Sequence, residues 1–204
     1  MKAVVQRVAA ASVSVAGEQV SSIGRGLCVL LGISRDDTER EIDFMVRKIL
    51  GLRVFEGAEG RPWSSSVAEA RGEVLCVSQF TLQAVLKGNK PDFHLAMAGE
   101  RAEPFYHLFL ERLRSAYSPE LVKDGKFGAL MRVHIENDGP VTIQIESPLP
   151  CADPKQIAKQ EKQQQRQQQT TPKVKSAAAS ASAAAEQQDK PSGAEEGSTA
   201  RSSD

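Results

Sequence analysis

Metal-binding and disulfide-forming residues are scarce in this chain of 204 residues, which holds three cysteines and three histidines. Cys28, Cys76 and Cys151 have no paired spacing, so the sequence predicts neither a zinc site nor a disulfide framework. Cys28 and Cys76 lie inside apolar runs, as buried thiols do, and this favours a reducing compartment. We therefore expect a protein that binds no metal and no other cofactor.

Long apolar runs are also missing. No stretch approaches the ~20 consecutive apolar residues that a helix needs to span a bilayer. The first apolar residues alternate with polar ones and do not form the central segment of a signal peptide. These absences predict a cytoplasmic protein that makes no membrane contact.

Aromatic residues are absent from one end of the chain. Residues 1–148 hold every Phe, Tyr and Trp, whereas residues 151–204 contain no aromatic residue and no Leu and are dominated by Gln, Ala, Ser and Lys. A segment of that composition buries too little apolar surface to offset the entropy lost on ordering. We therefore expect one folded domain at residues 1–148 and a disordered tail at residues 149–204.

An overall excess of charge is missing too, since basic and acidic residues number 26 each. The predicted domain is close to neutral and lacks the basic surplus of a protein that grips nucleic acid by its phosphates. The tail differs, because Lys155, Lys159, Lys162 and Arg166 follow one another with Glu161 as the one acidic residue among them. This run is either solvated or contacts DNA or RNA by charge. A tail-mediated DNA- or RNA-binding protein with a nuclear role is therefore the alternative hypothesis, and the run would also serve as a nuclear address.

The pattern of apolar residues in residues 1–148 predicts a mixture of strands and helices. The run from Gly26 to Ile33 is apolar throughout, as in a strand covered on both faces. Helical spacing follows Asp36 or Asp37, either of which can cap a helix, and returns from about Glu100 to Tyr117. The other predicted strands are residues 2–8, 11–15, 19–23, 52–55, 73–78, 129–136 and 141–146. This pattern predicts an α+β domain of six to eight strands with two main helices.

Ser78-Gln79-Phe80-Thr81-Leu82 is a short polar interruption at the end of one predicted strand. If that strand ends at a cleft, the hydroxyl and main-chain N–H groups of this segment would face a substrate. Alternatively, Ser78 and Thr81 only satisfy main-chain groups where the strand bends. Ser78 lies in no Gly-x-Ser-x-Gly motif, so a serine hydrolase is not indicated.

Side chains suited to proton or phosphate transfer are few. His107 and His134 fall within a predicted helix and strand, which is typical of structural histidines. His94 adjoins a predicted loop and is the one histidine placed as a candidate base. Lys87-Gly88-Asn89-Lys90 has the composition of a phosphate-binding loop without the Walker spacing, so an ATPase is not indicated.

Asn137-Asp138-Gly139-Pro140 separates the last two predicted strands. An Asp-Gly pair between two strands is a strong hairpin signal, so the residues alone favour a plain turn. Pro140 complicates this interpretation, because it removes a main-chain donor and raises the chance of a cis peptide bond. The role of Arg7 is also open. In a first strand it can be a charged residue at the edge of the sheet, with the aliphatic part of its side chain lying on the sheet.

Taken together, these segments resemble the D-aminoacyl-tRNA deacylase family. The resemblance covers residues 1 to about 148, and the tail resembles the extension of animal members. Five motifs carry it in order: Met1-Lys2-Ala3-Val4-Val5-Gln6-Arg7-Val8, Ser78 to Leu82, Gly88-Asn89-Lys90-Pro91, Gly125-Lys126-Phe127-Gly128-Ala129, and Asn137 to Thr142. Five ordered matches are far more specific than any one of them.

The resemblance implies a barrel-like mixed sheet in a homodimer, with active sites at the subunit interface. It places Ser78, Gln79, Phe80 and Thr81 in the catalytic wall, with the Phe80 N–H available to an oxyanion. It assigns four further residues to substrate binding and chiral selectivity: Gly139, Pro140, Arg7 and Asn137. It further implies that a cis Gly139-Pro140 peptide projects into the site and that Arg7 helps to hold it.

The resemblance also implies the reaction. The enzyme would bind the 3′-terminal adenosine of an aminoacyl-tRNA and hydrolyse the ester of a D-amino acid or glycine. The 2′-hydroxyl of that adenosine would assist the reaction, while Thr81 stays open as a possible nucleophile. Carbonyl groups of Gly139 and Pro140 would exclude every L side chain by repulsion. A deacylase that edits misacylated L residues is the remaining rival.

Overall fold

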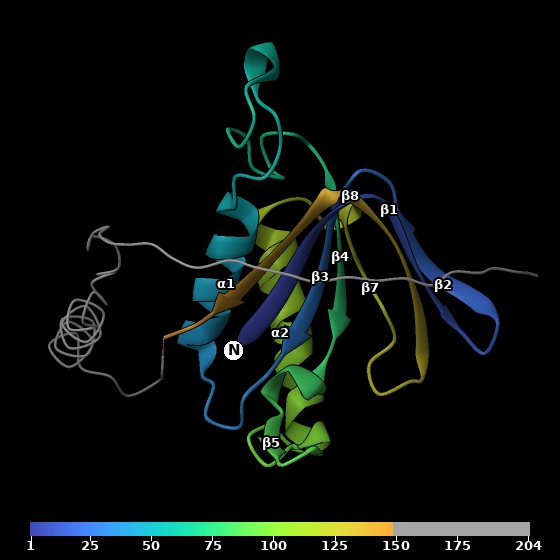
Figure 1. Ribbon diagram of the computed structural model, residues 1–204, viewed down its shortest axis with the longest axis vertical. Coiled ribbons are helices and arrows are strands. Elements are labelled where there is room, and N and C mark those ends of the chain that lie inside the picture. The colour runs from blue at the N-terminus through green and yellow to red at the C-terminus, as the bar shows by residue number, and fades with distance from the viewer. Residues whose placement is uncertain (149–204) are drawn as a thin grey trace, which may run out of the picture. The chain divides into compact units, whose positions relative to one another are not determined.

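The computed structural model describes residues 1–148. The tail predicted at residues 149–204 lies outside the described residues, so its predicted disorder and DNA contact stay predictions. Among residues 1–148, two long helices and a mixed β-sheet form the domain (Figure 1), which confirms the predicted α+β class. No helix in this part of the chain is long and apolar enough to cross a membrane.

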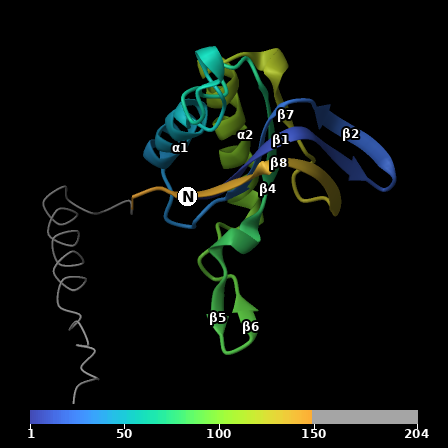
Figure 2. The same cartoon turned by 45° about the horizontal axis from the view of Figure 1, so that its top comes forward.

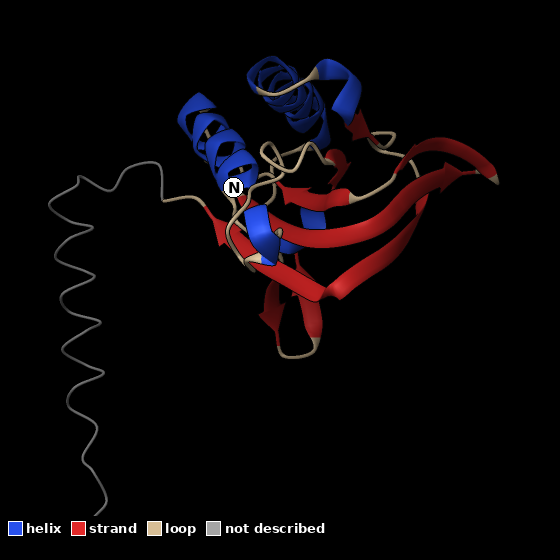
Figure 3. Cartoon of the chain, turned by 90° about the horizontal axis from the view of Figure 1, so that it is seen from above, coloured by secondary structure: helices blue, strands red, loops and turns tan. Residues whose placement is uncertain are grey.

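The sheet is organised around its first strand. The six strands are β1 (Lys2–Val15), β2 (Glu18–Ile23), β3 (Gly26–Gly32), β4 (Glu73–Ser78), β7 (Val122–Asp124) and β8 (Met131–Glu146). One edge of β1 pairs antiparallel with β3 along its first half and with β2 along its second, while β8 pairs along the other edge. β3, β4 and β7 are parallel to one another. The sheet is therefore mixed, as the resemblance implies, and its long strands curve strongly (Figure 3).

Both helices cover the same face of the sheet (Figure 3). α1 (Glu39–Gly51) and α2 (Gly99–Ala116) contribute buried side chains such as Met45 and Phe109 to the main apolar core. A second, smaller core contains residues of β1, β3 and β4, among them Cys28. Cys28 and Cys76 are fully buried, as predicted, and burial raises the pKa of the Cys28 thiol to about 11.

The start of α1 corrects one prediction. Thr38 is the N-cap, and it forms a capping box with Glu41, whose carboxylate accepts from the Thr38 N–H at 2.7 Å. Asp37 does not cap the helix because it is used elsewhere. Its carboxylate accepts hydrogen bonds from the Met1 ammonium group at 2.6 Å and from the Ser34 N–H at 2.6 Å. The residue before β1 is thereby tied to the segment before α1.

Three further segments differ from the predicted pattern. The strand expected at residues 52–55 is absent, and Phe55 forms only an isolated bridge to Ser65. The predicted loop before His94, which contains Lys87-Gly88-Asn89-Lys90, belongs to a tight hairpin of β5 (Val85–Lys87) and β6 (Lys90–Asp92). This hairpin projects from the domain (Figure 2). β7 was not predicted, because three residues are too few to show a periodicity.

The plain turn expected at residues 137–140 is wrong. β8 continues from Met131 to Glu146, and both of its halves pair with β1. The Asp-Gly signal fails here because a hairpin would reverse the chain, whereas β1 is long enough to accept one continuous antiparallel partner. The polar segment is instead a bulge within β8.

Candidate active site

The Ser78 segment lies where a central buried strand ends. β4 is apolar from Val74 to Val77, and Ser78 pairs in register with Leu31 of β3. The chain then turns, and the Gln79 N–H donates to the Leu31 carbonyl at 2.7 Å. Residues Phe80–Gln83 form a single 3-10 turn, η2. The sequence segment therefore ends the strand with a tight turn and does not continue it.

This turn is fixed to the end of β3 by Gly32. The side chain of Gln83 is buried and donates to the Gly32 carbonyl at 2.8 Å. A Cβ atom at Gly32 would lie 2.7 Å from the Leu82 Cβ and 2.9 Å from the Gln79 carbonyl oxygen. Only glycine lets the turn approach this closely, so the position of the Ser78 segment depends on the absence of a side chain at residue 32.

The turn leaves main-chain donors unused. The first hydrogen bond inside it runs from the Leu82 N–H to the Gln79 carbonyl, at 3.2 Å. The N–H groups of Phe80 and Thr81 precede that donor and have no partner within the turn, as at the start of any helix. The Gln79 side-chain amide donates to the Thr81 hydroxyl, so this hydroxyl is already an acceptor. Two adjacent N–H groups can therefore serve a developing negative charge.

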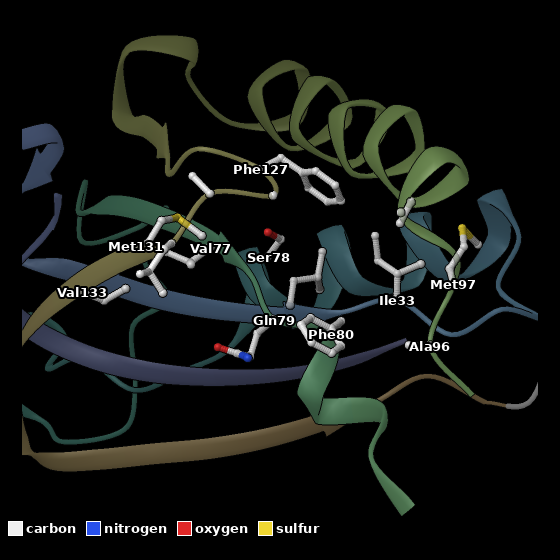
Figure 4. Close-up of a pocket in the computed structure, with 16 residues that line it drawn as sticks. Ile33, Val77, Ser78, Gln79, Phe80, Ala96, Met97, Phe127, Met131 and Val133 are labelled. Atoms are coloured by element: carbon white, nitrogen blue, oxygen red, sulfur yellow. The ribbon is translucent and has the colours of Figure 1, made fainter. Parts of the chain in front are cut away.

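A cavity of about 510 Å³ opens beside this turn (Figure 4). Ser78, Gln79 and Phe80 line it, and Thr81 does not. Its other walls come from the ends of β3 and β8, the start of α2 and two loops, with the side chains Ile33, Met97, Phe127, Met131 and Val133 among them. The lining is mostly apolar, and its polar side chains are those of Ser78 and Gln79.

The loop before β8 was not among the predicted site residues. Phe127, Gly128 and Ala129 line the cavity together with Leu130, whose side chain is 94% exposed. Gly128 has a φ of +71°, which favours glycine in this loop. The glycine-flanked segment Gly125 to Ala129 carried the family resemblance, so that motif was the available signal for this wall.

The second predicted group of residues surrounds the bulge in β8. Gln6 pairs with Thr142 and Val8 with Asn137, so the single residue Arg7 of β1 faces four residues of β8. The Asn137 side-chain amide donates to the Thr142 hydroxyl at 3.1 Å and closes the base of the bulge. Bulges are frequent beside active sites because they redirect a segment without ending the strand.

Arg7 holds this bulge against a distant part of the chain. Its Nε lies 3.0 Å from a carboxylate oxygen of Asp138, and its Nη1 donates to the Val54 carbonyl at 2.5 Å. Only 18% of the Arg7 side chain is exposed. Arg7 therefore joins the bulge to the segment after α1, and it is not the edge charge that the sequence left open.

Gly139 depends on the same arginine. Its φ is +101°, a conformation that L side chains rarely adopt. A Cβ atom there would lie 2.7 Å from Nη2 of Arg7 and 3.2 Å from Cγ2 of Val141. Val141 is buried and returns the strand to the core. Any larger residue at 139 would strain the main chain and displace the guanidinium group.

The two groups of predicted residues do not meet within one chain. Ser78 is level with Leu31, which pairs with Ala3 of β1, whereas Gly139 lies opposite Arg7. Ala3 and Arg7 are four residues apart, which is ~13 Å along a strand. Gly139, Pro140, Arg7 and Asn137 do not line the cavity that contains Ser78. Their roles in the reaction stay predictions.

The chain is similar to several known proteins. Residues 4–146 match the sequence profile described as D-Tyr-tRNA(Tyr) deacylase. D-aminoacyl-tRNA deacylase 1 of Bos taurus is 70% identical over 165 residues, which cover 79% of each chain. D-aminoacyl-tRNA deacylase of Drosophila melanogaster is 60% identical over 148 residues, covering 72% of this chain and 93% of the relative.

Two solved structures are also similar. The c-Myc DNA Unwinding Element Binding Protein is 70% identical, with a TM-score of 0.71, covering 72% of this chain and 99% of that chain. A probable eukaryotic D-amino acid tRNA deacylase is 20% identical, with a TM-score of 0.62, covering 71% and 97%. The second likeness shows the fold alone. The profile and the curated relatives show that the chain belongs to the D-Tyr-tRNA(Tyr) deacylase family, a class of hydrolases that act on ester bonds.

Proposed function

We propose that the chain hydrolyses the ester bond of D-aminoacyl-tRNA and releases the D-amino acid and the tRNA. The observation that carries this proposal is the free N–H group of Phe80, a residue that lines an apolar cavity, with the free N–H group of Thr81 next to it in the turn. The curated relatives, which are named D-aminoacyl-tRNA deacylases, support the substrate class. The cavity would take the terminal adenosine with its esterified amino acid.

The proposed chemistry needs little from side chains. An aminoacyl ester is already activated, so orientation of the ester and stabilisation of the oxyanion can carry its hydrolysis. The Phe80 N–H would donate to that oxyanion, a contribution of ~3–4 kcal/mol in the transition state. Water would attack the ester carbon with help from the 2′-hydroxyl of the adenosine, and the 3′-oxygen would leave with a proton.

The surroundings of Thr81 favour a role in positioning the turn over covalent attack on the ester. A nucleophilic hydroxyl needs a base within hydrogen-bond reach. The partner of Thr81 is the Gln79 amide, which donates to the hydroxyl oxygen and cannot remove its proton. Thr81 also does not line the cavity. We therefore assign Thr81 to the support of the turn, with Gln79.

The proposed enzyme is a homodimer in which each cavity receives the bulge of the other subunit. Two observations support this arrangement. Gly139 of the bulge and Ser78 of the cavity are at levels ~13 Å apart along β1 within one chain. Apolar side chains beside the cavity are also exposed, with Phe80 at 57% and Leu130 at 94%. A second copy would cover these side chains and bring Gly139 and Pro140 to the substrate.

In that arrangement the bulge would set the handedness of the substrate. Main-chain carbonyl groups of Gly139 and Pro140 would occupy the space that an L side chain needs, so every L residue would be rejected by repulsion. A D side chain would point away, whatever its identity. Glycine has no side chain to exclude, so glycyl-tRNA would be cleaved as well.

The test is deacylation of D-Tyr-tRNA, L-Tyr-tRNA and Gly-tRNA by the full chain. We expect hydrolysis of the D and glycyl esters and none of the L ester. Faster hydrolysis of the L ester would instead establish an enzyme that edits L residues. Sedimentation of the same preparation measures the oligomeric state, and an active monomer would refute the exchange of bulges.

A second candidate function is nucleic-acid binding through the tail. One similar solved structure bears the name of a DNA-binding protein. The match covers 99% of that chain but only 72% of this chain. That likeness therefore does not extend over the whole tail. Salt-dependent DNA binding that is lost when residues 151–204 are deleted would support this function and a nuclear location beside the cytoplasmic one. Unchanged binding would exclude the tail.

A further inference from the structure

A group of charged residues beside the cavity has no part in the proposed chemistry. It comprises Arg35, Lys87, Lys90, Asp92 and His94, which we call the rim cluster. Lys87, Lys90 and Asp92 belong to hairpin β5–β6, which projects from the domain (Figure 2), and His94 follows shortly after. The side chains of Arg35, Lys87 and Lys90 are positively charged at neutral pH.

The rim cluster is fixed to the wall of the cavity. The ring of Phe93, between Asp92 and His94, packs edge-on against the ring of Phe80, with their centroids 5.1 Å apart. The Arg35 N–H donates to the Leu95 carbonyl at 2.9 Å. Ala96 and Met97, the next residues, line the cavity. The cluster therefore lies at the rim of the proposed ester site.

Asp92 orients His94. Its carboxylate pairs with the Lys87 ammonium group and accepts from the His94 main-chain N–H at 2.9 Å. The His94 Nδ1 lies 2.5 Å from the same carboxylate, so Nδ1 donates to it and the ring is fixed. Nε2 takes no part in this contact. The His94 side chain is 49% exposed.

The positive charges of the rim cluster exceed the negative ones that face them. Lys87 and Lys90 are directly opposite across the hairpin, where two like charges destabilise a strand pair. Asp92 pairs with Lys87, and Lys90 has no ion pair among residues 1–148. Arg35 lies 3.5 Å from its neighbour Asp36. An anion bound between the lysines would relieve this repulsion.

We propose that the rim cluster binds the phosphodiester group next to the terminal adenosine of the tRNA. Lys87 and Lys90 would donate to its oxygens, and Arg35 would contribute charge. The His94 ring would donate from Nε2 as an imidazolium, since its Nδ1 proton is used by Asp92. This inference rests on the proposed function, since the ester must lie beside Phe80. It explains how a nearly neutral domain holds the end of a nucleic acid.

The test compares two small substrates. One is the D-tyrosyl ester of adenosine, which has no phosphate, and the other is the same ester on cytidylyl-(3′→5′)-adenosine, which has one. Lys90→Gln and His94→Gln remove candidate donors without breaking the Lys87–Asp92 pair. Lys48→Gln is the matched control, because Lys48 lies on α1 outside the cavity lining.

We expect Lys90→Gln and His94→Gln each to lower kcat/KM for the dinucleotide ester by about tenfold, the order of a lost charge-assisted hydrogen bond. The adenosine ester should change less than twofold, and Lys48→Gln should change neither. For D-Tyr-tRNA, the slope of log(kcat/KM) against log salt should fall by about 0.7 in Lys90→Gln. A wild type that cleaves only phosphate-bearing esters would itself show the phosphate contact.

Equal losses of kcat/KM on both esters would overturn the inference, because Lys90 and His94 would then only support the turn that contains Phe80. No loss on either ester would overturn it too. These outcomes differ from failure of the proposed function, in which the wild-type protein cleaves neither ester nor D-Tyr-tRNA.

Discussion

The turn after β4 and the bulge in β8 are both polar interruptions of apolar strands, and they are held in different ways. The turn is fixed by main-chain contacts with the adjacent strand and by the buried Gln83. The bulge is closed at its base by Asn137 and is held against the rest of the domain by one long side chain, Arg7, which reaches Asp138 and Val54. The turn should therefore survive most side-chain changes near it, whereas the bulge should fail when a single residue is altered.

Gly139→Ala should have the largest effect. It combines a positive φ with a Cβ placed 2.7 Å from the Arg7 guanidinium. We expect a loss of 100-fold or more in kcat/KM for D-Tyr-tRNA. The matched control is Gly17→Ala, where φ is +90° and nothing lies within 4 Å of the added Cβ. Both variants should lose about 1–2 kcal/mol of stability from backbone strain. Equal activity in the two would show that the bulge does not act in the reaction.

Arg7→Lys should follow in size. Lysine keeps the charge but cannot serve Asp138 and the Val54 carbonyl with one planar group. We expect about a tenfold to 100-fold loss of kcat/KM for D-Tyr-tRNA, and some gain of hydrolysis of L-Tyr-tRNA as the bulge loosens. Arg40→Lys on α1 is the control. A fully active, fully selective Arg7→Lys enzyme would contradict the role given to this side chain.

Gly32→Ala tests the turn in the same way. The added Cβ would press on Leu82 and on the Gln79 carbonyl, and overpacking of this kind costs about 1–3 kcal/mol. Activity should fall with stability, since the Phe80 N–H would shift. Gly51→Ala, where the Cβ meets nothing within 4 Å, is the control. Denaturant unfolding and deacylation measured together decide the outcome.

Thr81→Ala should have a small effect, below about fivefold, if the hydroxyl only supports the turn. A loss of several orders of magnitude would establish covalent catalysis by Thr81. Single-turnover kinetics that look for an acyl-enzyme intermediate separate the two cases.

Asp37 should give a modest pH dependence of stability. Burial raises its pKa, although hydrogen bonding to the Met1 ammonium group opposes the shift. The folded state then holds this proton more tightly than the unfolded state, so stability falls as pH rises from ~4, the unfolded value, through the raised pKa. The difference in unfolding free energy between wild type and Asp37→Asn should therefore decrease over that window. A difference that is flat or rises with pH would contradict the raised pKa.

Much of the fold follows from local patterns. The apolar run at residues 26–33 and the helical spacing of Ile42, Met45 and Ile49 predicted β3 and α1 correctly. The cap at Asp37 was wrong, because its carboxylate binds the distant Met1 ammonium group. The hairpin at Asp138-Gly139 was wrong for a similar reason, since β1 supplies a partner for both halves of β8.

The candidate site divides in the same way. The Ser78 segment stood out as a polar end of an apolar strand, and the structure places part of it in a cavity. The wall at Phe127 to Met131 was missed as a site, because nothing local indicates which loops face one another. The role of Arg7 in holding the bulge was implied by family resemblance alone, and its contact with Val54 depends on residues 47 positions apart.

By itself, the sequence determined the α+β class, the apolar strands and helix faces, and the glycines and polar segments where regular structure is interrupted. These features are set by periodicity and by conformational preference within a few residues. Only the tertiary structure decided that one polar segment ends a strand beside a cavity while the other remains inside a strand. That outcome depends on strand pairing and on long-range contacts, which join residues that no local pattern connects.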